Sequence, residues 1–539
     1  MASLVGITEF LTETRRIGGR LKEKCSDFVV KEIDLKGCIA EITGKVFIKK
    51  EEEKVEIKEI SEENAKKINE KIGQELGDKI LALAQRISGG EYESILEIPS
   101  PDDKEERTKI HFTIKEFAPM LTSCTEKANN IIRIYSSKLA QSFNKRQKLN
   151  LDSRGAKKTP SKYIQFTLNK QNLDTAKALK ILGKATGIKD KSFGIAGNKD
   201  KKALTSQNIT AFANYLDKLQ HAKLPENMQI GDFKYSDTEL KIGDLKGNRF
   251  EIIIRHLTCQ DESHISQLIE TLKVKGFVNY FGLQRFGNSV ENATHTIGLA
   301  ILTKNYQKAV DIILGPRSVK NEDENRARVN WIAYHDVDRA LQEFPIFCNI
   351  ERTILEGMRK AGSSNAVLNG FMALTRNSRM LYAHAYQSYV WNQVTSFRLQ
   401  MSQETLAGDL IQDLQDHVAY LTEENKKNYT IHDVVLPLPG SKILFPTNDA
   451  ASVYTKVLSQ DGISLQTFNE LQKEMALTGS YRKIVVKPEN LTWETVKLKE
   501  NNVDEDSTDF GVKVAFDLPS SSYATVCLRE IMGEEYIDN

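Results

Sequence analysis

The most regular alternation of hydrophobic and polar positions lies in YIQFTLNK (163–170), and it predicts a half-buried strand. Apolar residues then recur at helical spacing, after a candidate N-cap at Asp174 and before Gly187, a residue type that often ends helices. A second strand is predicted at 204–213. The polar turn GNKDKK (197–202) therefore lies in a loop between strands, shortly after a helix.

Similar patterns predict strands and helices along the rest of the chain. Further strands are predicted within 18–40, 246–256, 434–440, 481–488 and 510–519. Helical spacing covers 262–275 and most of 290–430. No segment repeats at a fixed period, so a repeat architecture is not predicted.

Length and charge limit the organisation of the protein. A chain of 539 residues corresponds to about two to four domains. The formal net charge is only +2, so any surface that binds nucleic acid must concentrate positive charge locally. Residues 45–80 are dense in Lys and Glu and predict a helical surface insertion with a solvated face. Residues 145–162 predict an exposed basic loop, either a phosphate contact or a linker.

Several classes of site have no signature in the sequence. The six cysteines form no C-x-x-C pair and the nine histidines show no paired-ligand spacing, so neither a disulfide framework nor a metal site is predicted. Free thiols fit a reducing compartment, the cytoplasm or the nucleus. No apolar run approaches 18 residues, so no membrane partner is expected.

The turn at 197–202 contains a carboxylate, Asp200, among lysines. GNKD resembles the guanine-binding N-K-x-D of GTPases, but the Asp comes one residue early and no phosphate loop is present, so that interpretation fails. An Asp in a turn usually binds its own backbone. Alternatively, the adjacent Lys199 and Lys201 would favour an ionised carboxylate and could hold RNA phosphates. Spacing alone favours the first interpretation.

The segment GFVNYFGLQRFG (276–287) combines aromatic residues and glycines with Asn279 and Arg285. Aromatic faces stack on unpaired bases and Arg pairs with phosphate, a combination that suits single-stranded RNA. A buried aromatic turn, in which glycines allow close approach, explains the same composition. Composition alone favours the buried turn.

Eight segments together resemble the TruD family of RNA pseudouridine synthases, in the family's order from residue 6 to 532. They are GITEF with LKEKCSDFVVKEI, AGNKDKKALTSQ, GDLKGNRFEIIIR, GFVNYFGLQRFG, HAYQSYVWN, VVLPLPG, YRKIVVKP and FDLPSSSYATVCLREIM. VLPLPG, the chain length and the early insertion resemble the eukaryotic, seven-type branch. Asn198 departs from the family, which has Thr or Leu at this position.

The resemblance implies a catalytic role for Asp200, as nucleophile at C1′ or as base at C2′ of the target uridine. Lys22 matches the family's N-terminal Lys and would pair with Asp200, favouring its charged form. Phe250 would stack on the flipped base, and Asn248 would position the base or the Asp. No cofactor or metal is implied.

Other residues of these segments are expected at the RNA. Lys199, Lys201, Arg285 and Asn279 are the candidates. Asp27 and Glu32, in the first segment, are expected to organise their strand instead of taking part in the chemistry.

The implied fold is α/β (α+β): a catalytic domain with a long mixed, largely antiparallel sheet, and an inserted TruD-specific domain. The expected parts are 1–40, the start of the catalytic domain; 41–130, a largely helical insertion; 131–285, the catalytic core; 286–484, the TruD-specific domain; and 485–539, the closing strands. The expected partner of this monomer is RNA, namely tRNA at position 13, with small nuclear, ribosomal or messenger RNA as further candidates.

Two other functions compete with this interpretation. An inactive RNA-binding protein of the same fold is disfavoured by the intact Asp200, Asn248 and Phe250. A methyltransferase would need a glycine-rich cofactor loop after an early strand, and the sequence shows none.

Overall fold

The computed structural model divides the chain into two compact units. The first contains Met1–Lys45 and Tyr163–Asn539, and the second contains Val46–Lys162. The structure describes residues 2–44, 60–101, 103–126, 130–136, 139, 161–287, 292–362, 365–413, 415–471, 475–498, 510–533 and 537–538. Most of the basic segment 145–162 lies outside the described residues.

The second unit is a small α/β fold with its own core. It contains α1 (Glu62–Ile72), α2 (Gln74–Ser88) and α3 (Lys104–Phe117), with an antiparallel sheet of order β3 (Ile95–Pro99), β5 (Ile131–Ser136) and β4 (Leu121–Glu126). The predicted boundary at residue 130 falls between β4 and β5, which pair along their whole length. The unit therefore extends beyond that boundary, because Ile132 and Ile134 of β5 complete its hydrophobic core.

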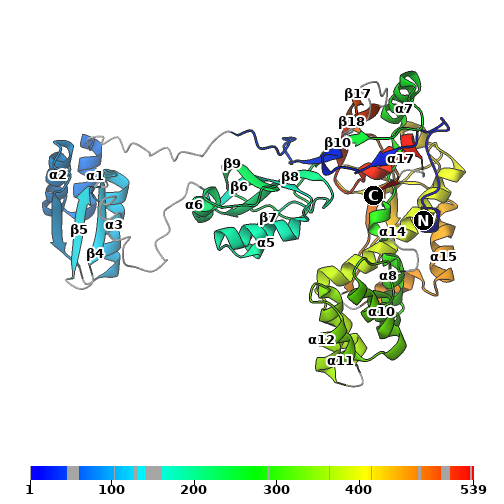
Figure 1. Ribbon diagram of the computed structural model, residues 1–539. Helices are drawn as coiled ribbons and strands as arrows, with labels where there is room; N and C mark the ends of the chain where they lie inside the picture. Colours follow the sequence, from blue (N-terminus) through cyan, green and yellow to red (C-terminus); the bar gives the residue numbers. More distant parts are fainter. Residues whose placement is uncertain are drawn as a thin grey trace. The chain divides into compact units, whose positions relative to one another are not determined.

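The first unit contains a mixed sheet of eight strands (Figure 1), which confirms the predicted fold class. Its order is β17 (Glu489–Lys497), β18 (Phe510–Pro519), β10 (Gly247–Ile254), β2 (Phe28–Ile33), β8 (Leu204–Phe212), β6 (Tyr163–Gln171) and β9 (Met228–Ser236), and β7 (Gly194–Ile195) pairs with β8. Only β2 and β8 pair in parallel among these neighbours. Strands from both ends of the chain thus meet in one sheet.

Strand register places five polar or aromatic residues on one face of this sheet. On β2, Val30 lies opposite Phe250 and Thr205. Glu32, two residues further along the strand, lies opposite Asn248. Directly paired residues share a face, and so do residues two apart. Thr205 in turn pairs with Lys170. This face therefore carries Glu32, Lys170, Gln207, Asn248 and Phe250.

Helix α5 (Thr175–Thr186) packs against this sheet, as Figure 1 shows. The side chain of Asp174 accepts a hydrogen bond from the backbone N–H of Lys177, and Gly187 adopts a left-handed conformation at the C-terminus. Both predicted ends of the helix are confirmed. Ala178, Leu179 and Leu182 are buried, so the opposite side of α5 faces solvent.

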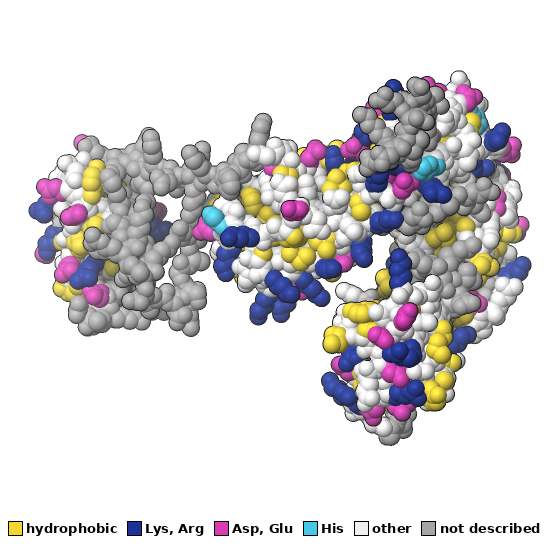
Figure 2. Space-filling view, in the orientation of Figure 1, with side chains coloured by type: hydrophobic (Ala, Val, Ile, Leu, Met, Phe, Trp, Pro, Cys, Tyr) yellow, Lys and Arg dark blue, Asp and Glu magenta, His cyan; other side chains and the backbone are white. Residues whose placement is uncertain are grey.

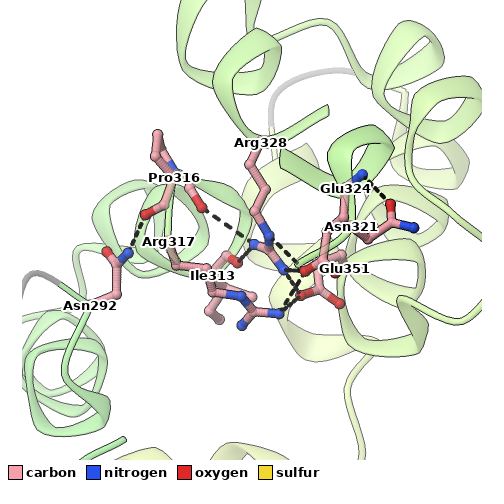
Figure 3. Close-up of polar contacts among 9 residues, drawn as sticks. Asn292, Ile313, Pro316, Arg317, Asn321, Glu324, Arg328 and Glu351 are labelled. Atoms are coloured by element: carbon pink, nitrogen blue, oxygen red, sulfur yellow. Dashed lines mark hydrogen bonds and ion pairs between the residues drawn. The ribbon is translucent and has the colours of Figure 1, made fainter. Parts of the chain in front are cut away.

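The remaining part of the first unit is mainly helical, as predicted. It contains α8 (Thr294–Leu302), α9 (Tyr306–Leu314), α10 (Glu322–Tyr334), α11 (Val337–Glu343), α12 (Asn349–Ala361), α13 (Ala366–Met372), α14 (Arg376–Met401), α15 (Ala450–Gln460) and α16 (Leu465–Asn469), with a sheet of order β13 (Val418–Tyr420), β12 (Leu410–Gln412), β14 (Val434–Leu438) and β15 (Ser480–Lys483). Figure 3 shows a buried ionic cluster that joins three of these helical segments. The guanidinium of Arg328 donates to Glu324 and Glu351 and to the carbonyl oxygen of Ile313.

A short strand pair closes the connection to this helical part. β11 (Phe277–Val278) pairs with β16 (Val485–Val486), so the chain leaves and returns at adjacent positions. The other elements are β1 (Arg20–Leu21), paired with β19 (Ile537–Asp538), and α6 (Leu216–Gln220), α7 (Glu262–Lys275) and α17 (Ala524–Met532). Among the described helices, none is long and apolar enough to cross a bilayer.

Candidate active site

The loop that carries Asp200 is fixed by buried side chains at the start of α5 and on β8. The backbone N–H of Lys199 donates to the Thr175 hydroxyl at 3.0 Å, and this hydroxyl lies 3.0 Å from Gln207 Oε1. The amide Nε2 of Gln207 donates to the carbonyl oxygen of Gly197, also at 3.0 Å. Thr175 and Gln207 are both buried. These contacts hold the loop backbone at Gly197 and Lys199, just before Asp200.

Lys170, at the end of β6, is a further support that the sequence analysis missed. Its side chain is buried, and Nζ donates to the carbonyl oxygens of Leu173 at 2.6 Å and of Asp200 at 3.0 Å. Nζ also lies 3.4 Å from the carbonyl oxygen of Lys199. The sequence does indicate Lys170 as a polar residue on the inward face of an otherwise apolar strand. The pattern does not show which groups its ammonium binds.

Burial lowers the pKa of Lys170 to about 8, although Asp200 and Asp174 act in the opposite direction. An unfolded lysine has a pKa of about 10.4, so the unfolded state binds more protons between these values. The contribution of Lys170 to the free energy of unfolding should therefore rise with pH from about 8 to 10.4, as the buried ammonium loses its charge. Below pH 8 the full cost of the buried charge is present.

This linkage predicts how Lys170→Met changes the pH dependence of stability. The difference in free energy of unfolding, wild type minus variant, should increase by about 3 kcal/mol between about pH 8 and pH 10.4, at about 1.36 kcal/mol per pKa unit. Urea unfolding at several pH values measures the difference. Lys201→Met, which removes an exposed lysine, is the matched control and should give a flat difference. A flat profile for Lys170→Met as well would contradict the assignment.

Lys199 forms a buried ion pair, which corrects its predicted role at the RNA. Its Nζ lies 2.7 Å from Glu32 Oε2, and the two side chains are 3% and 1% exposed. Glu32 Oε1 also accepts the backbone N–H of Asn208 at 3.1 Å. A phosphate cannot reach a lysine that is buried and paired in this way. Lys199 therefore joins the loop that carries Asp200 to β2, whereas Lys201 is exposed.

Asp200 itself projects from this scaffold toward solvent and contacts Lys22. The Lys22 Nζ lies 3.5 Å from Asp200 Oδ2, with side chains that are 6% and 39% exposed, respectively. Lys22 follows β1 with a positive φ of 56°, and its Nζ lies 4.4 Å from the centre of the Phe28 ring. The predicted pair is therefore formed, with a buried cation and an accessible carboxylate.

Phe250 and Asn248 lie on the same sheet face, on β10. The Phe250 ring is 6% exposed, stacks on Phe516 with ring centres 5.6 Å apart, and meets the edge of Phe28 at 6.2 Å. The ring that supports Lys22 thus also contacts Phe250. Asn248 Oδ1 is buried and accepts no hydrogen bond within the described part of the chain. It is an acceptor that a ligand could satisfy.

Asn279 is held within the protein, in contrast to the expectation that it contacts RNA. It is 4% exposed; its Nδ2 donates to the Lys483 carbonyl oxygen at 3.1 Å, and its Oδ1 accepts from Arg482 at 2.8 Å and from Ser522 at 3.0 Å. Its buried amide thus connects the segment just after β11 to β15 in the four-stranded sheet. This favours the buried-turn interpretation of 276–287.

Arg285 lies apart from Asn279 in the hydrogen-bond network. It belongs to a short 3₁₀ turn (Leu283–Arg285), is partly exposed, and its Nε lies 3.4 Å from the Ser388 hydroxyl of α14. Among the described residues, no hydrogen bond or ion pair joins Arg285 or Asn279 to Asp200. The structure thus brings Lys22 and Asp200 together and leaves Arg285 outside this pair.

The two expected strand-organising carboxylates have the predicted surroundings. Asp27 is fully buried and forms two hydrogen bonds with Arg255, at 2.7 and 2.9 Å. Glu32 pairs with Lys199. In the described part of the chain, no group of three or more His, Cys, Asp or Glu residues is arranged to hold a metal ion.

Comparison with known proteins decides the family of this site. The family model described as tRNA pseudouridine synthase D (TruD) matches residues 145–531, which include Asp200, Asn248 and Phe250. The chain belongs to the TruD family. It is accordingly an RNA pseudouridine synthase, an isomerase, as the resemblance implied. The first 144 residues, with most of the second compact unit, lie outside the family match.

Individual TruD-family relatives agree over nearly the whole chain. The human protein named pseudouridylate synthase 7 homolog is 32% identical, across 98% of this chain and 80% of that protein. Multisubstrate pseudouridine synthase 7 of Schizosaccharomyces pombe is 28% identical, across 98% and 89%. The crystal structure of a TruD protein from Methanosarcina mazei superposes with a TM-score of 0.59, at 20% identity, and covers 98% of this chain and 97% of that one, which supports the fold.

Proposed function

We propose that Asp200 is the catalytic carboxylate with which this enzyme isomerises uridine to pseudouridine in tRNA, at the position-13 type of site. The observation that carries the proposal is an accessible carboxylate on a loop with a fixed backbone, 3.5 Å from the buried ammonium of Lys22. The family's description names tRNA. The name of the fission yeast relative, multisubstrate, favours additional RNAs as substrates.

The reaction requires a carboxylate beside the sugar and no net change in atoms or electrons. The N1–C1′ bond of uridine breaks, the uracil turns, and C5 forms a new bond to C1′; the proton on C5 is lost and N1 gains a proton. Asp200 would act as nucleophile at C1′ or as the base that removes the C2′ proton. Either role uses the Asp200 carboxylate, and the Lys22 ammonium lies 3.5 Å from its Oδ2.

The face of the sheet beneath this carboxylate offers contacts for the displaced base. The target uridine must leave its stack before it reaches Asp200. In this proposal Phe250 provides an aromatic surface for the uracil, and Asn248 Oδ1 accepts its N3–H. The buried, unpaired state of that oxygen supports the assignment, because binding uracil would satisfy it. Exposed Lys201 and partly exposed Arg285 would contact the RNA backbone.

Lys22→Met should slow the chemical step while RNA binding is retained. The variant removes the cation beside Asp200, so we expect the single-turnover rate at saturating enzyme to fall by about 10- to 100-fold, with a dissociation constant for tRNA within about twofold of wild type. Lys24→Met, two residues away at an exposed lysine, is the matched control and should keep the wild-type rate. An equal rate for wild type and Lys22→Met would remove Lys22 from the site.

We propose that the enzyme works in a reducing compartment. All six cysteines are free, which supports a reducing compartment, the nucleus or the cytoplasm. Imaging of a fluorescent fusion of the full chain tests this part of the proposal, and retention in the secretory pathway would contradict it.

A further inference from the structure

The outer face of α5 carries a row of lysines that the catalytic chemistry does not use. Lys177, Lys180 and Lys184 are exposed and follow the i, i+3, i+7 spacing of one helix face, so they span about 10 Å along the axis. Lys189 and Lys191, just beyond the helix, are also exposed. Figure 2 shows the resulting group of dark blue side chains at the position where Figure 1 draws α5.

This row lacks the acidic partners that usually accompany lysines on a solvated helix. No Asp or Glu occurs from residue 175 to 189. The three helix lysines form no ion pair with any described residue. By contrast, α1 and α2 of the same chain pair their lysines, Lys67 with Glu63 and Lys79 with Glu75. The charge on α5 is therefore uncompensated within the described structure, in a protein whose formal net charge is only +2.

Local helix energetics oppose this arrangement. Lys177 lies in the first turn, where the helix dipole favours acidic residues, and the only acidic residue at this end is the N-cap, Asp174. Lys180 and Lys184 are like charges four residues apart, a spacing at which they repel. The dipole favours Lys184, which lies in the last turn, so the opposition is confined to Lys177 and to the Lys180–Lys184 pair. Such a local conflict is typical of a functional surface. Bound phosphates would relieve both unfavourable effects.

The row also begins beside the catalytic loop. Thr175, the first residue of α5, accepts the backbone N–H of Lys199, next to Asp200. The apolar side of the helix is buried against the sheet, so the direction of the lysine face is fixed. An RNA strand whose target uridine is at Asp200 can therefore continue along this face without crossing an acidic surface of α5.

We infer that the Lys177, Lys180 and Lys184 face of α5 binds the phosphate backbone of the substrate RNA that flanks the target uridine. The inference rests on the proposed function, because it takes Asp200 as the position of that uridine. Lys189 and Lys191, on either side of the exposed Asp190, follow the helix and are not part of the inferred surface. Such contacts supply affinity and orientation without reading sequence.

The test uses the full-length protein and an in vitro transcribed tRNA. Lys177→Gln, Lys180→Gln and Lys184→Gln are combined in one variant. The matched control combines Lys218→Gln, Lys223→Gln and Lys234→Gln, three exposed lysines of the β8–β9 connection and β9. Lys234 lies opposite Gln165, on the other face of the sheet from α5. Both triple variants lower the net charge by the same amount.

The α5 variant should bind the tRNA about tenfold more weakly at low salt, and its plot of log affinity against log salt concentration should be shallower by about 2, at about 0.7 per lost contact. Its single-turnover rate at saturating enzyme should match wild type. The control should keep both the affinity and the slope. An α5 variant with the wild-type slope, or equal losses in both triple variants, would overturn the inference.

A third protein separates this inference from the proposal about Asp200. Asp200→Asn retains the lysine row, so it should bind tRNA with the wild-type salt slope. Turnover by Asp200→Asn at the wild-type rate would contradict the catalytic assignment. It would not bear on the lysine surface, which the salt slopes of the two triple variants test. An unchanged slope in the α5 variant would contradict the lysine surface alone.

Discussion

Asp200→Asn should reduce pseudouridine formation by at least about 10³-fold. An amide can act neither as the nucleophile at C1′ nor as the base at C2′, and loss of a proton-transfer group alone commonly costs 10²- to 10⁴-fold. Binding of tRNA should remain within about twofold of wild type, because the substitution leaves the lysines that are proposed to bind the RNA backbone unchanged. Tritium release from [5-³H]uridine-labelled tRNA measures turnover, and filter binding measures affinity.

The neighbouring position provides a control for this result. Lys201→Met changes an exposed residue next to Asp200 without touching the buried supports of the loop. It should keep the chemical rate and weaken tRNA binding slightly. Parallel loss of binding and turnover in Asp200→Asn would indicate a disrupted fold, and a circular dichroism melt of the same preparation identifies that case.

The second large effect concerns stability. Lys199→Met should lower the free energy of unfolding by about 3–5 kcal/mol, because it leaves the Glu32 carboxylate buried without its cation. The remaining hydrogen bond from the Asn208 N–H satisfies only one oxygen of that carboxylate. Urea unfolding measures the loss. Lys201→Met, two residues along the chain and exposed, should change the same free energy by less than about 0.5 kcal/mol.

A double-mutant cycle separates the interaction energy of the Glu32–Lys199 pair from the cost of replacing each side chain. Glu32→Gln combined with Lys199→Met should be less destabilised than the sum of the single variants, since each removes the partner of a charge that the other also removes. Additive losses would show that the two residues act independently. The loop residues 197–200 depend on this pair, so turnover should fall with stability in the single variants.

The local features of the fold could be predicted because the residues that determine them are adjacent in sequence. Asp174 and Gly187 mark the two ends of α5 by their own hydrogen-bonding and backbone preferences. The alternation in β6 identifies its buried side. The motif around Asp200 likewise lies in one short segment, and the family resemblance connected it with Lys22, 178 positions earlier in the chain.

The features that could not be predicted depend on partners far apart in sequence. Lys199 and Lys201 are alike in sequence, yet only the register of β2 beside β8 places a carboxylate against the first of them. Lys170 binds backbone carbonyl groups, which no side-chain pattern reveals. The same holds for the expected boundary at residue 130: β5 follows it in sequence, yet β5 pairs with β3 and β4 of the second unit.

Asn279 shows the same limit for the aromatic segment. Composition left open whether 276–287 contacts RNA or forms a buried turn, and the hydrogen bonds from Arg482 and Ser522 favour the buried turn at this residue. Arg285, six residues later, is partly exposed. A single segment can therefore contain both a structural amide and a residue available to substrate.

The most direct test of the account is position-resolved mapping of pseudouridine on one tRNA transcript, treated separately with wild type, Asp200→Asn and Lys201→Met. Carbodiimide modification followed by reverse transcription locates each pseudouridine. We predict conversion of the position-13 uridine by the wild type and by Lys201→Met, and none by Asp200→Asn. Conversion of that uridine by Asp200→Asn at the wild-type rate would contradict the assignment of Asp200.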